Sequence, residues 1–495
     1  MGIVQKQAVK NTILSYIGLV LGYVNIIILY PAYFTLEQFG LIQLIQSISV
    51  VYAQFCAFGL INIIIRYFPF FKTEDRKHQG FVTWVTLIMI SGFFLITLIY
   101  IIFRPLIIDA YIERSGIFIE YYYVLVPLSF VSLIFNVFES FVRSIHRTVF
   151  AAFLRDVFFR LLTTIGIFLV FLKFISFPQF VLYFVLANFL IAILLILQII
   201  QSKQFKFIID IKSIKFKKIR EILKYGMFTL LAGSSYFFAQ NIDKIMLGSM
   251  VGLEIVGIYS VFLYIATVVI FPARSIYRIT VPIVAECWKN NDIKKIADIY
   301  RRTSLILMIF GSIIYIGIYI NSENISHFLK PEFRANFIFY LFLGLSFLID
   351  MTGGMNSDII NTSPKYKFDA LFNIIYMVLC IALNYIFIKI FGGLGAAIAI
   401  ALSMFVFNFI KWLFLFKAFR LQPFNGKNLS VLLIGIITMI VGLYFPVIKN
   451  LYFDILVRSS IAVIIFFGLL ILLKVSDDIT EKFQKYKNKL LPQKS

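Results

Sequence analysis

The sequence predicts an all-α membrane protein with about fourteen transmembrane helices. Of the 495 residues, 61% are hydrophobic and only 14% are charged, whereas a soluble globular domain is about half apolar and a quarter charged. The mean hydropathy is +0.94. The apolar residues form long continuous runs, which fit spanning helices of about 20 residues and not the short alternating strands of a β-barrel. Too little chain remains between the runs for a soluble enzyme domain of ordinary size.

The polar breaks between the runs set the order of the helices. A full-length apolar run follows Lys6 and Lys10 without a small-residue cleavage site, so we expect a retained first helix and not a signal peptide. The predicted spans are 11–33, 38–60, 80–103, 121–145, 149–172, 178–200, 223–245, 253–274, 299–320, 336–357, 366–388, 394–417, 428–447 and 453–474.

Lys and Arg residues indicate the orientation, because cytoplasmic loops of membrane proteins are enriched in them. With the N-terminus inside, most of the 46 Lys and Arg residues fall in inner loops. The outer loops hold only Arg104, Arg114, Lys173, Lys330, Arg334, Lys389, Lys449 and Arg458. Both termini are therefore predicted to be cytoplasmic. The net charge of +22 follows from this bias, and no nucleic-acid partner is expected.

The longest polar segment divides the first twelve helices into two groups of six. The predicted organisation is an N-lobe at 1–200, a basic linker at 201–222, a C-lobe at 223–420, two further helices at 421–475 and a basic cytoplasmic tail at 476–495. The linker is expected to lie on anionic membrane lipids. Two six-helix repeats of like orientation are one of the architectures that transporters use.

The two groups share a motif at the start of their second helices. The segments Leu36-Glu37-Gln38-Phe39-Gly40-Leu41 and Leu253-Glu254-Ile255-Val256-Gly257-Ile258 both fit the pattern L-E-x-x-G-[LI]. Each segment begins a span that is entered from outside. The equal placement favours an internal repeat over a chance match between apolar segments.

Further stretches point to a known family. They are Ile65-Arg66-Tyr67-Phe68-Pro69, Asn241-Ile242-Asp243-Lys244-Ile245-Met246-Leu247-Gly248, Val256-Gly257-Ile258-Tyr259-Ser260 and Pro282. With Glu37-x-x-Gly40-Leu41 and the helix count, they make the chain resemble the polysaccharide flippase branch of the multidrug/oligosaccharidyl-lipid/polysaccharide exporter superfamily. The resemblance implies a V-shaped pair of six-helix lobes around a cavity lined by helices 1, 2, 7 and 8, with two peripheral C-terminal helices.

The resemblance also implies a function. Such a flippase turns undecaprenyl-pyrophosphate-linked oligosaccharide repeat units from the inner to the outer leaflet of the bacterial cytoplasmic (inner) membrane by alternating access. The product would serve O-antigen and lipopolysaccharide, capsule or exopolysaccharide assembly. The implied partners are the lipid-linked oligosaccharide, a polysaccharide polymerase and a chain-length regulator.

Three arginines at the inner ends of helices 2 and 8 are candidates for binding the pyrophosphate. Arg274 and Arg278 are four residues apart and share a helix face with each other, and Arg66 lies at the corresponding end of the other repeat. A guanidinium group binds phosphate oxygens in pairs and keeps its charge. The alternative is that these side chains reach the lipid headgroups without contacting cargo.

Two arginines inside predicted spans have carboxylates four residues before them. Glu139 precedes Arg143, and Asp156 precedes Arg160. Charged groups at membrane depth are costly and often functional. We weigh two hypotheses equally: ion pairs that lock the lobe, or arginines that line the cavity and bind substrate.

Neutral polar side chains occur within or at the ends of helices 1, 2 and 7. Asn25, Gln54, Gln240 and Asn241 could bind sugar hydroxyls in a wet cavity. They could equally hold neighbouring helices together.

Carboxylates provide candidates for coupling transport to an ion gradient. Asp350 falls near the middle of helix 10 and precedes Gly353-Gly354, which favours a broken helix. Broken helices with carboxylates at their ends form cation or proton sites in many transporters. Asp358 is a second candidate, although cytoplasmic exposure also explains it. Asp243 is the third, as part of either a structural pair with Lys244 or an outer gate.

Several absences narrow the function. No Walker-type phosphate loop occurs, which disfavours direct use of ATP. His78, His146 and His327 and the three cysteines lack metal-ligand spacing, so no metal or other cofactor is expected. The chain is thus predicted to be a transporter and not an enzyme. The alternatives are a drug/cation antiporter of the same superfamily, a lipid II flippase, and a membrane-bound polymerase or glycosyltransferase.

Overall fold

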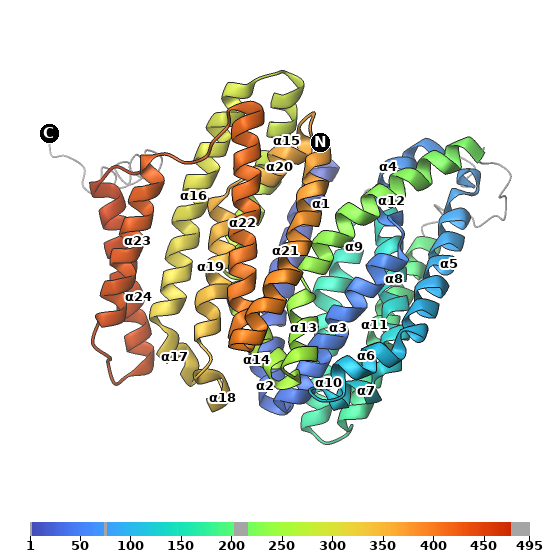
Figure 1. The fold of residues 1–495 in the computed structure, drawn as a ribbon, viewed down its shortest axis with the longest axis horizontal. Helices are drawn as coiled ribbons and strands as arrows, with labels where there is room; N and C mark the ends of the chain where they lie inside the picture. Colours follow the sequence, from blue (N-terminus) through green and yellow to red (C-terminus); the bar gives the residue numbers. More distant parts are fainter. Residues whose placement is uncertain (1, 74–76, 146, 202–215, 477–495) are drawn as a thin grey trace. The chain divides into compact units, whose positions relative to one another are not determined.

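A computed structural model describes residues 2–73, 77–145, 147–201 and 216–476. The described residues are helical apart from short turns and loops (Figure 1). Most of the predicted linker (202–215) and nearly all of the predicted tail (477–495) lie outside the described residues. The all-α fold class predicted from the sequence is confirmed.

The chain forms two compact units. Unit 1 comprises Met1–Val261 with Asn373–Ala396, and unit 2 comprises Phe262–Phe372 with Ala397–Ser495. The three dividing points fall inside helices, because α14, α21 and α22 each contribute to both units. Each unit is described on its own below.

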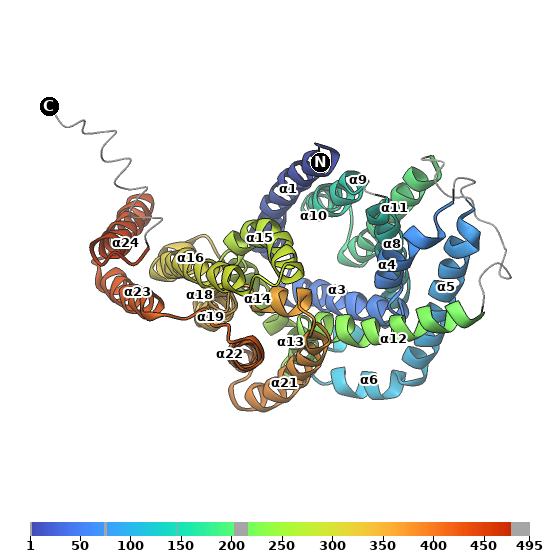
Figure 2. The same cartoon turned by 90° about the horizontal axis from the view of Figure 1, so that it is seen from above.

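Unit 1 is built around α8, which packs against α3, α4 and α11. The side chains of α8 that face these helices include Leu128, Val131 and Phe135, all fully buried. Viewed from above, α1 lies beside α9 and α10 (Figure 2). The elements are α1 (Gly2–Tyr23), η1 (Val24–Leu29), α2 (Tyr30–Tyr33), α3 (Leu36–Cys56), α4 (Leu60–Phe71), η2 (His78–Gly80), α5 (Phe81–Ile102), α6 (Arg104–Tyr111), α7 (Gly116–Glu120), η3 (Tyr122–Val124), α8 (Leu125–Ser144), α9 (Val149–Ala152), η4 (Phe153–Phe158), α10 (Phe159–Phe171), α11 (Phe177–Gln201), α12 (Phe216–Ala239), α13 (Ile242–Met250), most of α14 (Leu253–Ala266) and most of α21 (Lys367–Phe391).

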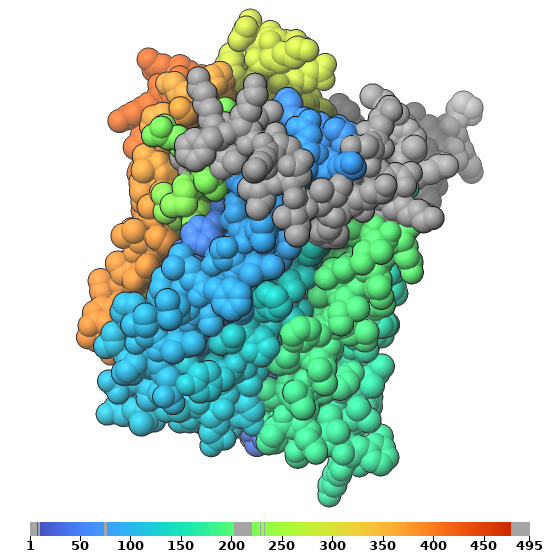
Figure 3. All heavy atoms as spheres, turned by 90° about the vertical axis from the view of Figure 1, so that its right-hand side faces the viewer, coloured from blue at the N-terminus to red at the C-terminus, as the bar shows by residue number. Residues whose placement is uncertain are grey.

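The outward face of unit 1 is apolar. Figure 3 shows the side formed by α5 (blue) and α11 (green). Large hydrophobic side chains are exposed along both helices, such as Phe94 and Leu98 on α5 and Leu182 and Leu186 on α11. A soluble protein rarely exposes a continuous apolar surface of this kind. The surface is the one expected for contact with lipid chains.

Unit 2 is built around α16, which packs against α15, α19, α23 and α24. The elements are α15 (Phe271–Lys289), α16 (Ile293–Ile320), α17 (Ser322–His327), α18 (Pro331–Arg334), α19 (Ile338–Thr352), α20 (Asn356–Thr362), α22 (Gly393–Phe419), α23 (Gly426–Tyr444) and α24 (Leu451–Leu472). The two C-terminal helices α23 and α24 therefore belong to unit 2 and contact its central helix directly.

Helices occupy all fourteen predicted ranges, but fewer qualify as membrane spans by length and hydropathy. Within the described residues, 10 helices qualify, or up to 12 if two bent pairs each count as one span. The predicted spans 149–172 and 223–245 fall on α9–η4–α10 and α12–α13. The first carries three charged residues and the second many small polar ones, which lowers their hydropathy. The chain is a multi-pass membrane protein.

The repeat predicted from the two L-E-x-x-G motifs extends further along the chain. After α3, a turn at 57–59 leads into α4, and after α14, a turn at 267–270 leads into α15. The predicted spans 38–60 and 253–274 are thus wrong at their inner ends, because each ends in a turn and a second helix follows. The angle between α14 and α15 is 55°. The apolar runs in the sequence do not reveal such breaks, since the apolar residues continue through the turns.

A buried ion pair fastens α24 within unit 2. Asp454 and Arg458 are almost fully buried, and the Nε–Oδ2 distance is 3.1 Å. The Asp454 carboxylate also accepts hydrogen bonds from the side chain of Asn324 and the backbone N–H of Ile448. Arg458 also donates to the Gly442 carbonyl oxygen at 2.8 Å. The sequence analysis placed Arg458 in an outer loop, whereas the structure places it inside α24.

We expect the Arg458→Met variant to lose about 3–5 kcal/mol of stability, because it leaves a buried carboxylate without its counter-charge. The measurement is thermal unfolding of the purified protein in detergent. The double variant Asp454→Asn with Arg458→Met removes the charge and keeps the acceptor for Asn324, so it should recover most of the loss. Equal melting temperatures for the single variant and the parent protein would contradict this role.

Candidate functional site

The two L-E-x-x-G motifs meet each other in unit 1. A Cβ atom on Gly40 would overlap the carbonyl oxygen of Leu253, and one on Gly257 would lie 2.8 Å from the carbonyl oxygen of Leu36. The contact is therefore reciprocal: the glycine of each motif lies against the backbone carbonyl group of the first residue of the other motif. Only glycine permits this approach of α3 and α14. The motif that marks the repeat is also the place where its two copies touch.

A polar pocket lies at the start of these two helices. It has a volume of about 270 Å³, and its lining includes Glu37, Glu254 and Arg114. The two glutamates occupy equivalent positions in the repeat. The loop that carries Arg114 is held against α13, where Ser115 Oγ donates to the Gly248 carbonyl oxygen at 2.5 Å and Tyr111 Oη donates to that of Ile245 at 2.9 Å.

Asp243 is buried near the same end of unit 1. Its carboxylate accepts a hydrogen bond from Tyr259 Oη and one from the backbone N–H of Lys244 at 2.8 Å. Tyr376 and Cys380 of α21 lie beside Tyr259. The structure thus connects Asp243 to α14 and α21 through a tyrosine, which the sequence analysis did not anticipate.

Arg66 and Gln54 lie on the segment α3–α4 where it faces α12. The Arg66 guanidinium is exposed and stacks over the Tyr225 ring, 4.3 Å from the ring centroid. The amide nitrogen of Gln54 would be 3.7 Å from a Cβ on Gly233 in α12. Gln240 and Asn241 form the turn between α12 and α13, where Asn241 Nδ2 donates to the Phe237 carbonyl oxygen at 2.9 Å.

Arg160 of α10 and Asn25 of η1 join α10 to α1 and η1. Arg160 Nη1 donates to the Gly18 carbonyl oxygen, and Asn25 Nδ2 donates to the Arg160 carbonyl oxygen at 2.9 Å. The expected Asp156–Arg160 ion pair is absent, and Asp156 instead accepts a hydrogen bond from Ser15 Oγ at 2.9 Å. The physical reason is the π-helix η4, whose wider turn removes residues four apart from a common face.

Arg143 does form the ion pair with Glu139, at a distance of 3.0 Å between Nη2 and Oε1. Arg155 Nη1 binds the other carboxylate oxygen of Glu139 at 2.8 Å and links η4 to α8. Arg155 was not among the candidate residues of the sequence analysis. Two partly exposed guanidinium groups thus share one carboxylate, which leaves an excess of positive charge at this place.

The broken helix predicted at Gly353-Gly354 is present in unit 2. α19 and α20 meet at an angle of 45°, and Gly354 has a φ of +62°. The break is held by hydrogen bonds from Tyr277 Oη to the Gly354 carbonyl oxygen (3.0 Å) and from Ser304 Oγ to that of Thr352 (2.7 Å). A Cβ on Gly353 would overlap the side-chain oxygen of Asn408.

Asp350 lies one turn before the break. Its carboxylate accepts a hydrogen bond from Asn408 Nδ2 at 3.4 Å. Asn356 of α20 donates to Asn408 Oδ1 at 2.6 Å, so the two half-helices and α22 share one amide. Asn408 therefore links the side chain of Asp350 in α19 to that of Asn356 in α20.

Lys411 completes this cluster. Its side chain is only 2% exposed, and its Nζ atom lies 3.1 Å from Asp369 Oδ1 and 2.6 Å from Ser357 Oγ. Asp350 and Asp358 lie within electrostatic range of the same ammonium group. Among these four residues there is one cation for three carboxylates. We call Asp350, Asp358, Asp369 and Lys411 the acidic cluster.

The sequence analysis found Asp350 and Asp358 but missed Lys411 and Asp369. Lys411 looks like one more basic residue at the inner end of a span. The signal that could have found it is Asn408, which lies three residues earlier on the same helix face and is also polar. Asp243 belongs to unit 1 and is not part of the acidic cluster.

Arg274 and Arg278 extend from α15 in unit 2, and both are exposed. Arg274 lies over the Phe271 ring at 5.2 Å from its centroid. Tyr277, between them in the sequence, bonds to the break at Gly354. The helix with the two candidate phosphate-binding residues is thus directly connected to the broken helix.

No protein-family model matches the chain. A membrane protein of Methanocaldococcus jannaschii that is described as uncharacterized is 23% identical over 458 residues, which cover 88% of this chain and 87% of that protein. Among solved structures, the lipid II flippase MurJ in an inward closed conformation matches with a TM-score of 0.74 at 15% identity, over 94% of this chain and 98% of that one.

Multidrug transporters of the MATE family have the same fold. An inward-facing member of the MOP superfamily matches with a TM-score of 0.61 at 15% identity, over 81% of this chain and 94% of that one. These likenesses show the fold: the chain is a polytopic helical membrane protein of the MurJ and MATE type. At identities this low a shared fold does not establish a shared cargo, so the cargo is argued below from the residues of the site.

Proposed function

We propose that this protein is a transporter that moves a polyprenyl-pyrophosphate-linked oligosaccharide from the inner to the outer leaflet by alternating access, with N- and C-termini in the cytoplasm. The observation that carries the proposal is the extent of the match. The lipid II flippase structure covers 94% of this chain, whereas the multidrug transporter covers 81%. A chain with two helices beyond the transporter core is better accounted for by a lipid flippase.

The exposed arginines support an anionic cargo. Arg66 lies in α4 of unit 1, and Arg274 and Arg278 lie in α15 of unit 2. Each of these helices follows the turn after α3 or α14, on the side that the distribution of basic residues assigns to the cytoplasm. A pyrophosphate carries several negative charges, and several guanidinium groups are needed to replace its hydration. Arg143 and Arg155 add positive charge at the same end of unit 1.

The acidic cluster supports coupling to a proton or sodium gradient. Three carboxylates with one ammonium group inside a membrane protein are costly unless a cation or proton is taken up. The cluster lies at the break between α19 and α20, so uptake or release of charge there would change the hydrogen bonds that connect the two half-helices. Asp243, with its tyrosine partner, is a second candidate for the same role in unit 1.

The experiment is a transfer assay in proteoliposomes. A fluorescent polyprenyl-pyrophosphate oligosaccharide is placed in one leaflet, and its movement is followed with and without a pH or sodium gradient. Movement that requires the protein and increases with the gradient supports the proposal. Movement of lipid II alone would assign the chain to lipid II transport, and export of ethidium without any lipid movement would assign it to drug/cation antiport.

We expect Arg274→Ala to reduce lipid transfer about tenfold, because a charge-assisted hydrogen bond contributes about 1.5–3 kcal/mol. The side chain is exposed, so the amount of folded protein should stay unchanged. Lys289→Ala, at the other end of α15, is the matched control and should transfer lipid at the rate of the parent protein. If Arg274→Ala transfers lipid at the rate of the parent protein, Arg274 does not take part in binding the cargo.

A further inference from the structure

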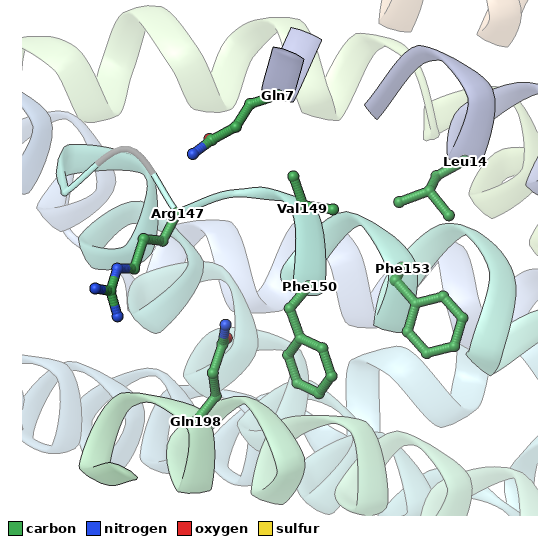
Figure 4. Close-up of a pocket in the computed structure, with 7 residues that line it drawn as sticks. All are labelled: Gln7, Leu14, Arg147, Val149, Phe150, Phe153 and Gln198. Atoms are coloured by element: carbon green, nitrogen blue, oxygen red, sulfur yellow. The ribbon is translucent and has the colours of Figure 1, made fainter. Parts of the chain in front are cut away.

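A pocket in unit 1 lies outside the clusters described above. It is located between the start of α1, the segment α9–η4 and the end of α11, and it has a volume of about 450 Å³ (Figure 4). Its polar lining residues are Gln7, Arg147 and Gln198. Leu14, Phe150 and Phe153 form the greater part of its apolar wall.

The polar and apolar residues are separated within the pocket. Figure 4 shows the amide groups of Gln7 and Gln198 pointing toward the space beside Arg147, whereas Leu14 and Phe153 lie at the opposite side. Arg147 forms no ion pair with any residue that the structure describes. The side-chain oxygen of Gln198 is buried without a hydrogen-bond partner. Buried polar atoms in proteins are usually hydrogen-bonded to protein or to water, so this oxygen can accept a hydrogen bond from a group in the pocket.

The surroundings of the pocket are those of a lipid-exposed surface. Ile13 and Ile17 are exposed on α1, and Leu197 and Ile200 are exposed on α11, the two helices that contribute Leu14 and Gln198 to the pocket. The distribution of basic residues assigns this end of unit 1 to the inner leaflet. A molecule in that leaflet can therefore place its polar group beside Arg147 and its chains along the exposed apolar side chains.

We propose that this pocket binds one phospholipid of the inner leaflet through an anionic phosphate-diester headgroup. One guanidinium group matches the single charge of a phosphate diester. The amide N–H groups can donate to phosphate oxygens, and the oxygen of Gln198 can accept a hydrogen bond from a headgroup hydroxyl, whereas that of Gln7 accepts from Thr148 Oγ1 at 3.5 Å. The apolar wall fits the first part of an acyl chain. A pyrophosphate would need more positive charge than this pocket contains, which distinguishes the site from the proposed cargo site.

The test is native mass spectrometry of the full-length protein with added phosphatidylglycerol. We expect one tightly bound lipid, and about tenfold weaker binding for Arg147→Gln, since one charge-assisted contact is lost. Arg301→Gln is the matched control, because Arg301 is an exposed arginine of unit 2 that does not line the pocket. Gln198→Glu is a second variant and should exclude the lipid by repulsion between like charges.

A photoactivatable phosphatidylglycerol locates the site. Labelling of peptides from 147–153 or 195–201 in the parent protein, lost in both pocket variants, supports the proposal. Several outcomes overturn it: equal binding by Arg147→Gln and Arg301→Gln, labelling confined to other helices, or equal binding of the uncharged diacylglycerol with the same chains. Displacement of phosphatidylglycerol by polyprenyl phosphate at lower concentration also overturns it, because the pocket would then belong to the cargo.

Discussion

Asp350→Asn is expected to abolish gradient-driven lipid transfer. The substitution keeps the size of the side chain and its ability to accept a hydrogen bond from Asn408, but it removes the charge that can bind a proton or sodium ion. We expect transfer in the presence of a gradient to fall at least about tenfold, to the level seen without one, because the neutral amide can neither bind and release a proton nor supply the charge that holds a sodium ion. The assay is lipid transfer in proteoliposomes over a range of pH and sodium concentrations.

The chain offers a close control for this variant. Asp298 is an aspartate of the same unit that pairs with Arg302 and is 57% exposed. Asp298→Asn should leave transfer and its ion dependence unchanged, since exposed ion pairs contribute little. If Asp350→Asn transfers lipid at the parent rate with the same pH and sodium dependence, the acidic cluster is not the coupling site.

Gly40→Ala is expected to open the contact between α3 and α14. The added methyl group would overlap the backbone of Leu253, which cannot move aside as a side chain can. Overpacking of this kind costs about 1–3 kcal/mol, which is enough to shift the population toward a conformation with these helices apart. Spin labels at positions 37 and 254 should show a longer distance, and lipid transfer should fall because the outer end no longer closes.

Gly317→Ala serves as the control for the glycine variant. Gly317 lies inside α16, and a Cβ there would contact no atom within 4 Å. Alanine should be neutral or should stabilise the helix by up to about 1 kcal/mol. The three cysteines of the chain are buried, so they should not compete strongly for the spin label. An unchanged distance and unchanged transfer in Gly40→Ala would show that the contact is not part of the transport cycle.

The candidate site was only partly predictable from the sequence. Asp350 and the break at Gly353-Gly354 were found, because a carboxylate and paired glycines stand out within an apolar run. Lys411 was missed, since a lysine at the inner end of a span is what the distribution of basic residues leads one to expect. Of the two hypotheses for Arg160, the ion pair with Asp156 does not form, because a π-helical turn changes which residues share a face without leaving a clear mark in the sequence. Substrate binding by Arg160 stays a prediction.

The motif glycines were also only partly understood from the sequence. Their spacing in Leu36–Leu41 and Leu253–Ile258 indicated an internal repeat, and the structure contains matching pairs of helices on both sides of a turn. The sequence did not indicate that Gly40 and Gly257 touch the opposite motif. A contact between segments far apart in the chain leaves no local pattern in the sequence, except where close approach requires glycine. A single sequence does not show whether another residue would be tolerated at that position.

The sequence by itself determined the class of this protein. Its apolar runs are long enough to cross a membrane and must form helices there, because lipid offers no partner for backbone polar groups. The tertiary structure alone decided which charged residues meet. Asp350, Asp358, Asp369 and Lys411 come from four helices, and only packing brings them within range of one another. Hydropathy and ion pairs between residues four apart, such as Glu139–Arg143, can be read along one helix. Contacts between helices depend on packing, and that difference separates what could be predicted from what only the structure shows.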